Sequence, residues 1–122
     1  MAAPSVLLIG FGNPGCQDDG LGPAFAEAVA ALGCDGVTVD ADYQLVVEDA
    51  HAMAQHDVVV FADADAAGAA PFALTPVTGK AAPGFSSHSV RPEELVWMAE
   101  RLFDRAVEAY VLSIRGRSFE QL

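Results

Sequence analysis

Two aspartates and one histidine lie far apart in this chain, at positions that an α/β sheet could bring together. Asp19 follows a glycine-containing stretch after the apolar run Ser5–Gly10, Asp63 directly follows the apolar run "DVVVFA", and His88 lies in the loop "GFSSHSVRPEEL". Mixed carboxylate and imidazole ligands suit a borderline ion such as Ni²⁺ or Zn²⁺ better than Mg²⁺. Three protein ligands also leave coordination positions open, as a functional site requires. The pattern predicts a metal site at Asp19, Asp63 and His88.

Alternating apolar and helical segments predict the framework that would position these side chains. The expected strands are Ser5–Gly10, Gly36–Asp40, Asp57–Ala62, Phe72–Val77 and Ala106–Ile114, and the expected helices are Leu21–Leu32, Gln44–Gln55 and Pro92–Arg105. This alternation predicts an α/β domain with a mostly parallel sheet. Pro76 indicates an edge strand, since proline cannot donate to a ladder. In a 2-1-3 strand order, a crevice opens at the carboxyl ends of the first and third strands, where Asp19 and Asp63 would meet.

Each candidate residue also has an ordinary structural interpretation. A lone histidine in a loop, such as His88, is usually polar and exposed. Asp63 could cap the end of a strand, and Asp65 competes with it as a ligand. Asp18 could cap the helix that follows it.

The second expected helix contributes to the core and carries two further histidines. Leu45, Ala52 and Met53 are its candidate core residues. His51 lies on this helix and His56 at its end, where a histidine interacts favourably with the helix dipole. Neither histidine is assigned to the metal site.

A glycine motif at Gly10–Gly15, "GFGNPG", matches G-x-G-x-x-G and raises the alternative of a dinucleotide site. Asp40, at the end of the second expected strand, occupies the place of a ribose-binding acid. A pyrophosphate site, however, needs a helix that starts within the glycines. Pro14 interrupts such a helix, and the acidic pair Asp18–Asp19 would repel phosphate. The motif therefore favours a tight turn after the first strand.

Length and charge narrow the class of protein. The 122 residues predict a single domain, 1–122, with a mainly hydrophobic composition. The formal net charge of −11, from 6 Lys+Arg against 17 Asp+Glu, makes nucleic acid and anionic lipid poor partners, because both are bound through cations. A basic peptide, a cationic protein surface or a metal ion is compatible with this charge.

Nothing in the sequence indicates a membrane protein or a secreted one. No apolar run approaches the roughly 20 residues that span a bilayer. The N-terminus "MAAPSVLLIGFG" lacks the basic leader of a signal peptide. The 2 cysteines, Cys16 and Cys34, form neither a disulfide framework nor a metal-type spacing. These features predict a cytoplasmic protein.

Four motifs resemble the hydrogenase maturation proteases, the nickel-dependent endopeptidases that process the large subunits of nickel-iron hydrogenases. The quoted stretches are "GFGNPGCQDDGLGP", "VDADYQLVVEDA", "DVVVFADAD" and "FSSHSVRPEELVWMAERLF". In the family, the first is a glycine-asparagine turn followed by an acidic pair, a glycine and a helix. The second resembles a strand and helix in one branch of the family, the third a strand with a terminal aspartate, and the fourth the histidine loop. The likeness runs over almost the whole chain, in the same order.

The resemblance implies a fold, a set of ligands and an activity. The fold is a three-layer α/β/α sandwich around a twisted, largely parallel sheet of about five strands. The ligand positions of the family match Asp19, Asp63 and His88, and Asp40 and Tyr43–Gln44 match a segment that shapes the cleft. Such proteins remove a C-terminal extension from the large-subunit precursor once nickel is inserted. The nickel is expected to come with the precursor, and Zn²⁺ or Cd²⁺ to substitute in vitro.

The sequence leaves the chemistry of cleavage open. No activated nucleophile is visible, although serines flank His88. A metal ion could polarise the scissile carbonyl or activate a water, or a carboxylate such as Asp19 or Asp63 could act as the general base. Members of the family are sometimes classed as aspartic-type endopeptidases.

The end of the sequence differs from the family pattern. Family members continue past the last strand with a glycine-rich loop and a further helix, whereas this chain stops at "IRGRSFEQL". The expectation is a shortened member, or a chain that completes its core by association. The alternatives to a maturation endopeptidase are a non-catalytic relative that binds a hydrogenase precursor or metal, a nucleotide-binding module, and a metal-dependent hydrolase of small molecules.

Overall fold

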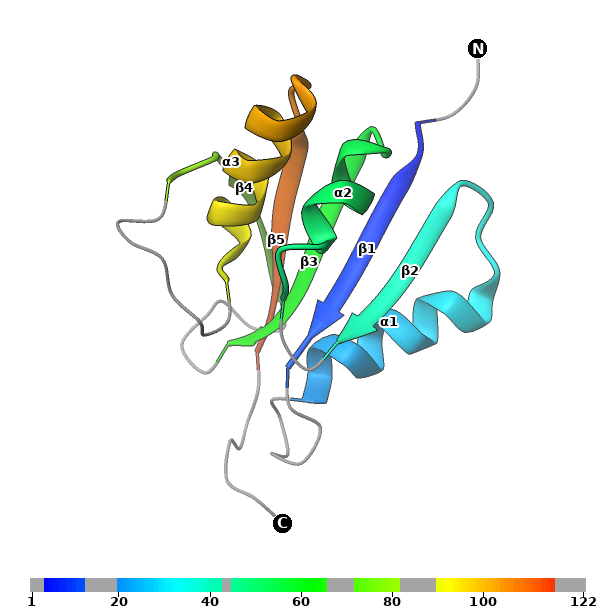
Figure 1. Ribbon diagram of the computed structural model, residues 1–122. Coiled ribbons are helices and arrows are strands. Elements are labelled where there is room, and N and C mark those ends of the chain that lie inside the picture. The colour runs from blue at the N-terminus through cyan, green and yellow to red at the C-terminus, as the bar shows by residue number, and fades with distance from the viewer. Residues whose placement is uncertain (1–3, 13–19, 43–44, 66–71, 82–89, 116–122) are drawn as a thin grey trace.

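The computed structural model describes residues 4–12, 20–42, 45–65, 72–81 and 90–115 (Figure 1). The strands are β1 (Val6–Phe11), β2 (Val37–Asp42), β3 (Val58–Asp65), β4 (Phe72–Val77) and β5 (Glu108–Arg115), and the helices are α1 (Leu21–Leu32), α2 (Asp49–Ala54) and α3 (Pro92–Phe103). No helix among these residues is long and apolar enough to cross a bilayer.

The strands form one five-stranded sheet in the order β2-β1-β3-β5-β4. β1 pairs in parallel with β2 and β3, β3 pairs in parallel with β5, and β4 alone pairs antiparallel, with β5. The first three strands therefore have the 2-1-3 order that the expected crevice between β1 and β3 requires. Pro76 lies in β4, at the edge of the sheet, where its missing N–H interrupts no second ladder.

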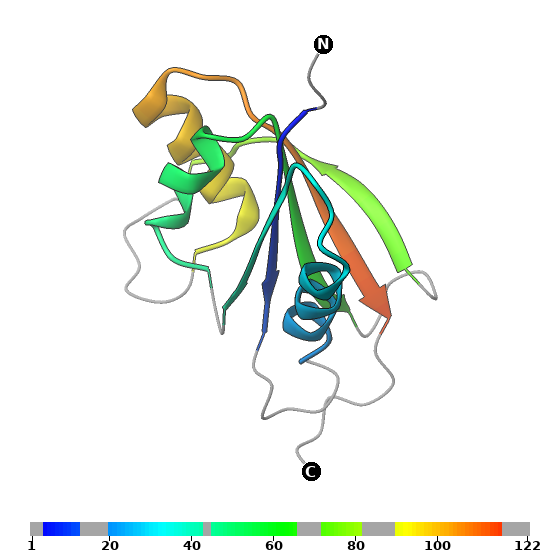
Figure 2. The same ribbon diagram turned by 90° about the vertical axis from the view of Figure 1, so that its right-hand side faces the viewer.

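Helices cover both faces of the sheet, which confirms the three-layer sandwich. α2 and α3 pack together on one face, and α1 lies on the other (Figure 2). Alternation along each strand divides the apolar side chains between two cores. The larger core lies on the α2–α3 face and contains Leu7, Ile9, Leu45, Ala50, Met53, Val59, Phe61, Leu95, Val96, Ala99, Val107 and Ala109. The smaller core, beneath α1, contains Leu8, Ala26 and Ala62.

Glycines let α1 lie directly on the sheet. A Cβ at Gly22 would lie 2.4 Å from the carbonyl oxygen of Phe11 and 2.5 Å from that of Ala62, and a Cβ at Gly10 would lie 2.2 Å from the carbonyl oxygen of Gly22. Only residues without a side chain permit this approach. The helix ends at Gly33, whose φ of 64° is the left-handed conformation that glycine adopts at a helix C-terminus.

On the face of the sheet that carries α1, β5 and the edge strand β4 are not covered by this helix as β1 is. The packing contacts of α1 are with β1, β2 and β3 (Figure 2). On the α1 side of the sheet, Phe72 pairs with Ile114 and Leu74 with Leu112. The exposed fractions are 60% for Phe72 and 56% for Leu74. Within the part of the chain that the structure describes, one face of the β4–β5 pair is therefore apolar and open.

Most elements lie within two residues of the sequence-based prediction, but α2 and β3 differ from it by more at one end. α2 begins at Asp49, whereas a helix was expected from Gln44. Asp49 Oδ2 accepts a hydrogen bond from the backbone N–H of Val46 at 2.9 Å, so the chain turns there before the helix starts. β3 extends to Asp65, beyond the expected end at Ala62, because β5 continues to pair with it.

Candidate functional site

The carboxyl ends of β1 and β3 lie side by side, and Asp63 lies at this edge of the sheet. Gly10 pairs with Ala62 in the last pair of the β1–β3 ladder, so Asp63 is the first residue of β3 beyond it. Asp63 still pairs with Ser113 of β5 and is therefore part of β3. The sequence-based prediction had placed it just after the end of this strand. Asp63 is half-buried.

The side of the sheet on which Asp63 lies follows from the alternation of β3. Val59 and Phe61 belong to the larger core and Ala62 to the smaller one. Because successive side chains of a strand point to opposite faces, Asp63 points to the α2–α3 face.

Asp19 lies outside the described residues, but Gly12 and Gly20, on either side of residues 13–19, are described. The chain leaves β1 through Gly12, whose φ of 144° is open to glycine alone, and returns at Gly20, directly before α1. The tight contact of Gly22 with Phe11 and Ala62 holds the first turn of α1 against the ends of β1 and β3. The residue after Asp19 is therefore held close to the strand edge that carries Asp63.

His88 also lies outside the described residues, two positions before Val90. Val90 is partly buried against the larger core, on the same face of the sheet as Phe11 of β1. α3 begins shortly afterwards, at Pro92, whose position in the first turn suits its missing N–H. The chain that leaves the histidine loop therefore enters the fold on the α2–α3 face, the face toward which Asp63 points.

The structure thus places one of the three predicted ligands and leaves the other two undescribed. Tyr43 and Gln44 also lie outside the described residues, and nothing is described of the side chain of Asp65. Among the described residues, no group of three or more His, Cys, Asp and Glu side chains could hold a metal ion. The metal site at Asp19, Asp63 and His88 stays a prediction.

His51 and His56, the two histidines among the described residues, make contacts close to α2. His56 contacts the carbonyl oxygen of Ala52 at 2.7 Å through Nδ1 and Thr38 Oγ1 at 3.1 Å through Nε2. His51 lies against Gln55, with its ring 5.5 Å from that of Phe103. The contacts of both histidines are therefore with α2, β2 and the end of α3.

The first described helix after the glycine motif does not support the dinucleotide alternative. α1 begins at Leu21, after Gly20, and residues 13–15 of the motif lie outside the described residues. The free N–H groups of the first turn of α1 are therefore separated from the glycine motif by the acidic pair Asp18–Asp19. Asp40 is exposed and pairs with Ile9 in the β1–β2 ladder.

Sequence reasoning missed the roles of Gly22 and Asp49. Gly22 has no part in the sequence-based prediction, because its close approach to Phe11 and Ala62 depends on the distance between backbones. Asp49 is the described charged residue with the most complete burial, with an exposed fraction of 7%. Burial raises its pKa above the ordinary 3.8, the Val46 N–H opposes this, and the nearby charges of Asp40 and Glu48 add to the rise.

The raised pKa of Asp49 predicts a pH-dependent gain in stability from Asp49→Asn. A carboxyl with a raised pKa in the folded state stabilises the fold while protonated, and loses that contribution as the pH rises through the folded pKa. The amide keeps an oxygen for the Val46 N–H and carries no charge. At pH 7 we expect the variant to gain on the order of 1 kcal/mol in free energy of unfolding.

Urea denaturation between pH 3.5 and pH 8 measures this gain. The difference from the original chain should shrink as the pH falls toward 3.8, where its own carboxyl becomes neutral. Asp35→Asn, at an exposed position, is the control and should change little at any pH. A difference for Asp49→Asn that is the same at every pH would contradict the explanation.

The fold is that of the hydrogenase maturation proteases of known structure. No family model matches the chain, and no curated protein sequence matches it. The NiFe hydrogenase maturation protease HycI from Thermococcus kodakarensis KOD1 superposes with a TM-score of 0.70 at 18% identity, over 97% of this chain and 78% of the other. The hydrogenase 2 maturation peptidase from Thaumarchaeota archaeon SCGC_AB-539-E09 has a TM-score of 0.63 at 19% identity, over 97% and 83%. The hydrogenase maturating endopeptidase HybD from E. coli has a TM-score of 0.64 at 17% identity, over 96% and 77%.

Proposed function

We propose that this chain is an endopeptidase that removes a C-terminal extension from the large-subunit precursor of a nickel-iron hydrogenase after nickel insertion. The observation that carries the proposal is the fold, which the chain shares over 97% of its length with a NiFe hydrogenase maturation protease. The place of Asp63, just beyond the Gly10–Ala62 pair at the edge of the sheet, supports a site there.

In this proposal the precursor supplies the nickel, and the chain recognises it through Asp19, Asp63 and His88. Carboxylate oxygens and an imidazole nitrogen are suitable donors for such an ion. The half-buried position of Asp63 limits its contact with water, which strengthens its attraction to a cation. When bound, nickel would supply Lewis-acid activation of the scissile carbonyl or of a water. Asp63 would hold the ion, or accept the proton of the attacking water.

A cleavage assay tests the proposal. The chain is incubated with nickel-loaded large-subunit precursor and, separately, with nickel-free precursor, and the precursor mass is followed by mass spectrometry. We expect loss of the C-terminal extension from the nickel-loaded form alone. If a known maturation protease trims the same precursor and this chain does not, the proposed activity is wrong.

The open face of β4 and β5 favours one alternative, a non-catalytic relative that binds a hydrogenase precursor or metal. Phe72 and Leu74 present an apolar surface that a protein partner could cover. This alternative predicts a stable complex with the precursor and no trimming. Binding measured by size-exclusion chromatography, together with the mass of the bound precursor, separates the two functions.

A further inference from the structure

The side of the sheet that carries α1 has a covered half and an open half. α1 packs on β1, β2 and β3, and no helix among the described residues lies on this side over β5 and β4 (Figure 2). Paired residues of neighbouring strands share a face, so the side chains of β5 and β4 that point to this side are those of Glu108, Tyr110, Leu112, Ile114, Phe72, Leu74 and Pro76. The hydroxyl of Tyr110 donates to Oε2 of Glu108 at 2.6 Å. The other five side chains are apolar.

α1 is apolar on its outer side as well. Its sequence, LGPAFAEAVAAL, contains one charged residue, Glu27. On the side that faces away from the sheet, Ala24, Ala28 and Ala31 are exposed. Leu32 has an exposed fraction of 74%. A helix that is apolar all round is typical of a buried position, so α1 has the composition of a helix that contacts a second surface.

The flank of α1 that faces β5 carries larger apolar side chains. The connection from β1 through α1 to the parallel strand β2 is right-handed, as such connections are in general, and this fixes the orientation of the helix on the sheet. Each residue turns an α-helix by about 100°. Because Ala26 packs on the sheet, Phe25 points toward β5 and Glu27 toward β2. Leu32 lies about two turns after Phe25, on the same flank. This apolar flank lies beside the open face of β4 and β5.

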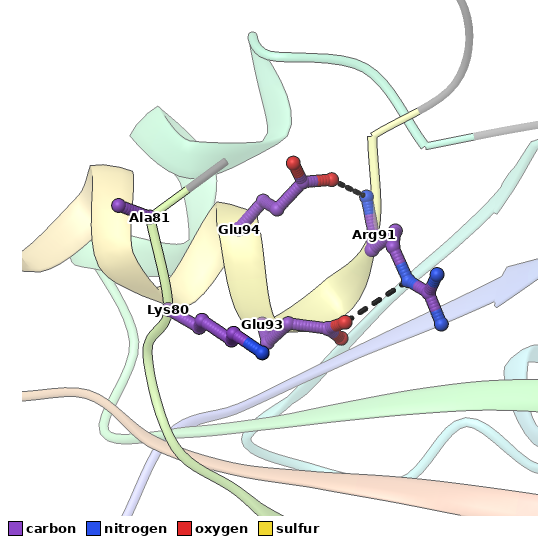
Figure 3. A pocket seen from close by; sticks show the side chains of 5 residues that line it. All are labelled: Lys80, Ala81, Arg91, Glu93 and Glu94. Atoms are coloured by element: carbon purple, nitrogen blue, oxygen red, sulfur yellow. Dashed lines mark hydrogen bonds and ion pairs between the residues drawn. The ribbon is translucent and has the colours of Figure 1, made fainter. Parts of the chain in front are cut away.

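Charge makes this side of the molecule suitable for contact between two copies of the chain. The formal net charge is −11, so two copies repel one another wherever carboxylates gather. Among the described residues of α1, β4 and β5, the charged ones that lie on this side are Glu27 and Glu108. The opposite side is more highly charged. At the first turn of α3, Nε of Arg91 lies 3.0 Å from Oε1 of Glu93, and Glu94 lines the same cavity (Figure 3).

We propose that the chain forms a homodimer through this side of the sheet, in which α1 of each copy covers the open face of β4 and β5 of the other. A two-fold axis parallel to the strands, midway between the two sheets, produces this arrangement because it places the covered half of one copy opposite the open half of the other. The two α1 helices then lie side by side, with Phe25 and Leu32 at their contact. Phe72 and Leu74 lie beneath the helix of the other copy.

The area of this contact fits a stable dimer. α1 has 12 residues. At about 1.5 Å per residue and a diameter of about 10 Å, a helix of this length covers roughly 200 Å² of the surface beneath it. Each copy makes three contacts of this size: its helix on the other sheet, its sheet under the other helix, and helix against helix. The two copies together therefore bury roughly 1,200 Å², which is the lower end of the range for stable, specific interfaces.

The inference does not depend on the proposed function. Asp63 points to the α2–α3 face, which stays exposed in the dimer. Dimer formation and precursor cleavage are therefore measured separately, and either one can fail without the other.

Sedimentation velocity of the full chain over a series of concentrations tests the dimer. We expect a species of twice the mass of the chain at the higher concentrations. Leu74→Glu should raise the dissociation constant at least about a hundredfold, because each copy would bury an unpaired carboxylate. Ala28→Glu, on the outer side of α1, should have the same effect. Ala28 is exposed in the single copy, so this variant should fold as the original chain does.

Leu102→Glu is the matched control. Leu102 is also an exposed leucine, with an exposed fraction of 72%, but it lies near the end of α3, on the opposite side of the sheet. This variant should form the dimer as the original chain does, and circular dichroism checks that every variant is folded. The inference is overturned if the original chain is monomeric at every concentration, if either Leu74→Glu or Ala28→Glu dimerises normally, or if all three variants dissociate alike.

Two further measurements identify a different occupant of the open face if the chain is monomeric. A complex with the hydrogenase precursor that Leu74→Glu abolishes would assign this face to the precursor. A marked loss of thermal stability in monomeric Leu74→Glu, without such a complex, would show that the chain itself covers the face. Each of these results contradicts the homodimer.

Discussion

The Asp63→Asn variant is expected to lose precursor cleavage by at least about a hundredfold. Asparagine has nearly the same shape and keeps one acceptor oxygen, but it carries no negative charge and cannot accept a proton as a base. Substitution of a residue that merely supports a metal ligand typically lowers metal affinity or activity by about 10–100-fold. Loss of the charge of the ligand itself should lower the cleavage rate by more than that. The same result is expected whether Asp63 holds the ion or serves as the base. Initial rates on nickel-loaded precursor measure the effect.

Asp57→Asn is the control for this substitution. Asp57 directly precedes β3, at the amino end of the strand, whereas Asp63 lies toward its carboxyl end. Asp57 accepts hydrogen bonds from Ser5 N–H at 2.8 Å and from Arg105 at 3.0 Å. These bonds lower the pKa of Asp57, the largest effect being the Ser5 N–H. The control should cleave normally wherever it is folded, as checked by circular dichroism. Equal rates of precursor cleavage by the two variants would show that Asp63 has no role in the site.

The Gly22→Ala variant is expected to lose about 3 kcal/mol of free energy of unfolding, with a fall in melting temperature of about 10 °C. The added methyl group would meet two backbone carbonyl oxygens, at 2.4 Å and 2.5 Å, and neither can rotate away as a side chain could. To relieve the clash, α1 must move off the ends of β1 and β3. We therefore also expect precursor cleavage to fall at temperatures where the variant remains folded.

Gly33→Ala separates this clash from a general effect of losing glycine. Gly33 ends the same helix, and nothing lies within 4 Å of a Cβ built there. Its φ of 64° makes alanine unfavourable by about 1–2 kcal/mol, without any steric contact. Thermal unfolding followed by circular dichroism compares the variants. A Gly22→Ala chain no less stable than Gly33→Ala would show that α1 does not lie on the sheet as described.

The sequence predicted the strands well because their physical signals are local. The run that became β1 is apolar throughout, as a strand buried on both faces requires, and Pro76 marked the edge strand. α1 has the predicted bounds, Leu21–Leu32, because Gly33 ends it sharply. The end of β3 was missed because it depends on pairing with β5, some 50 residues further along the chain.

The site was less predictable because its parts meet only in the folded chain. Strand order correctly placed Asp63 at the carboxyl edge beside the end of β1. The close approach of Gly22 depends on distances between backbones, which no pattern of residue types expresses. The start of α2 was set by one hydrogen bond, from Val46 to Asp49, and not by helical periodicity.

The open face of β4 and β5 could not be predicted either, because it depends on how β4 pairs with β5 and on which strands α1 covers. The sequence of β4, FALTPV, is only a weak indication of a strand. Its antiparallel pairing with β5 places Phe72 and Leu74 beside Ile114 and Leu112 on one face. α1 packs on β1, β2 and β3, so those side chains receive no equivalent cover from it.

A crystal structure of the chain with Cd²⁺ tests the central claim most directly. The anomalous signal of the ion locates it independently of any assumption about the loops. We predict a single strong site at the carboxyl edge of β1 and β3, with the side chains of Asp19, Asp63 and His88 bonded to the same ion. A Cd²⁺ ion bound elsewhere while Asp63 has no metal contact, or His88 lying too far from Asp63 to share a cation, would contradict it.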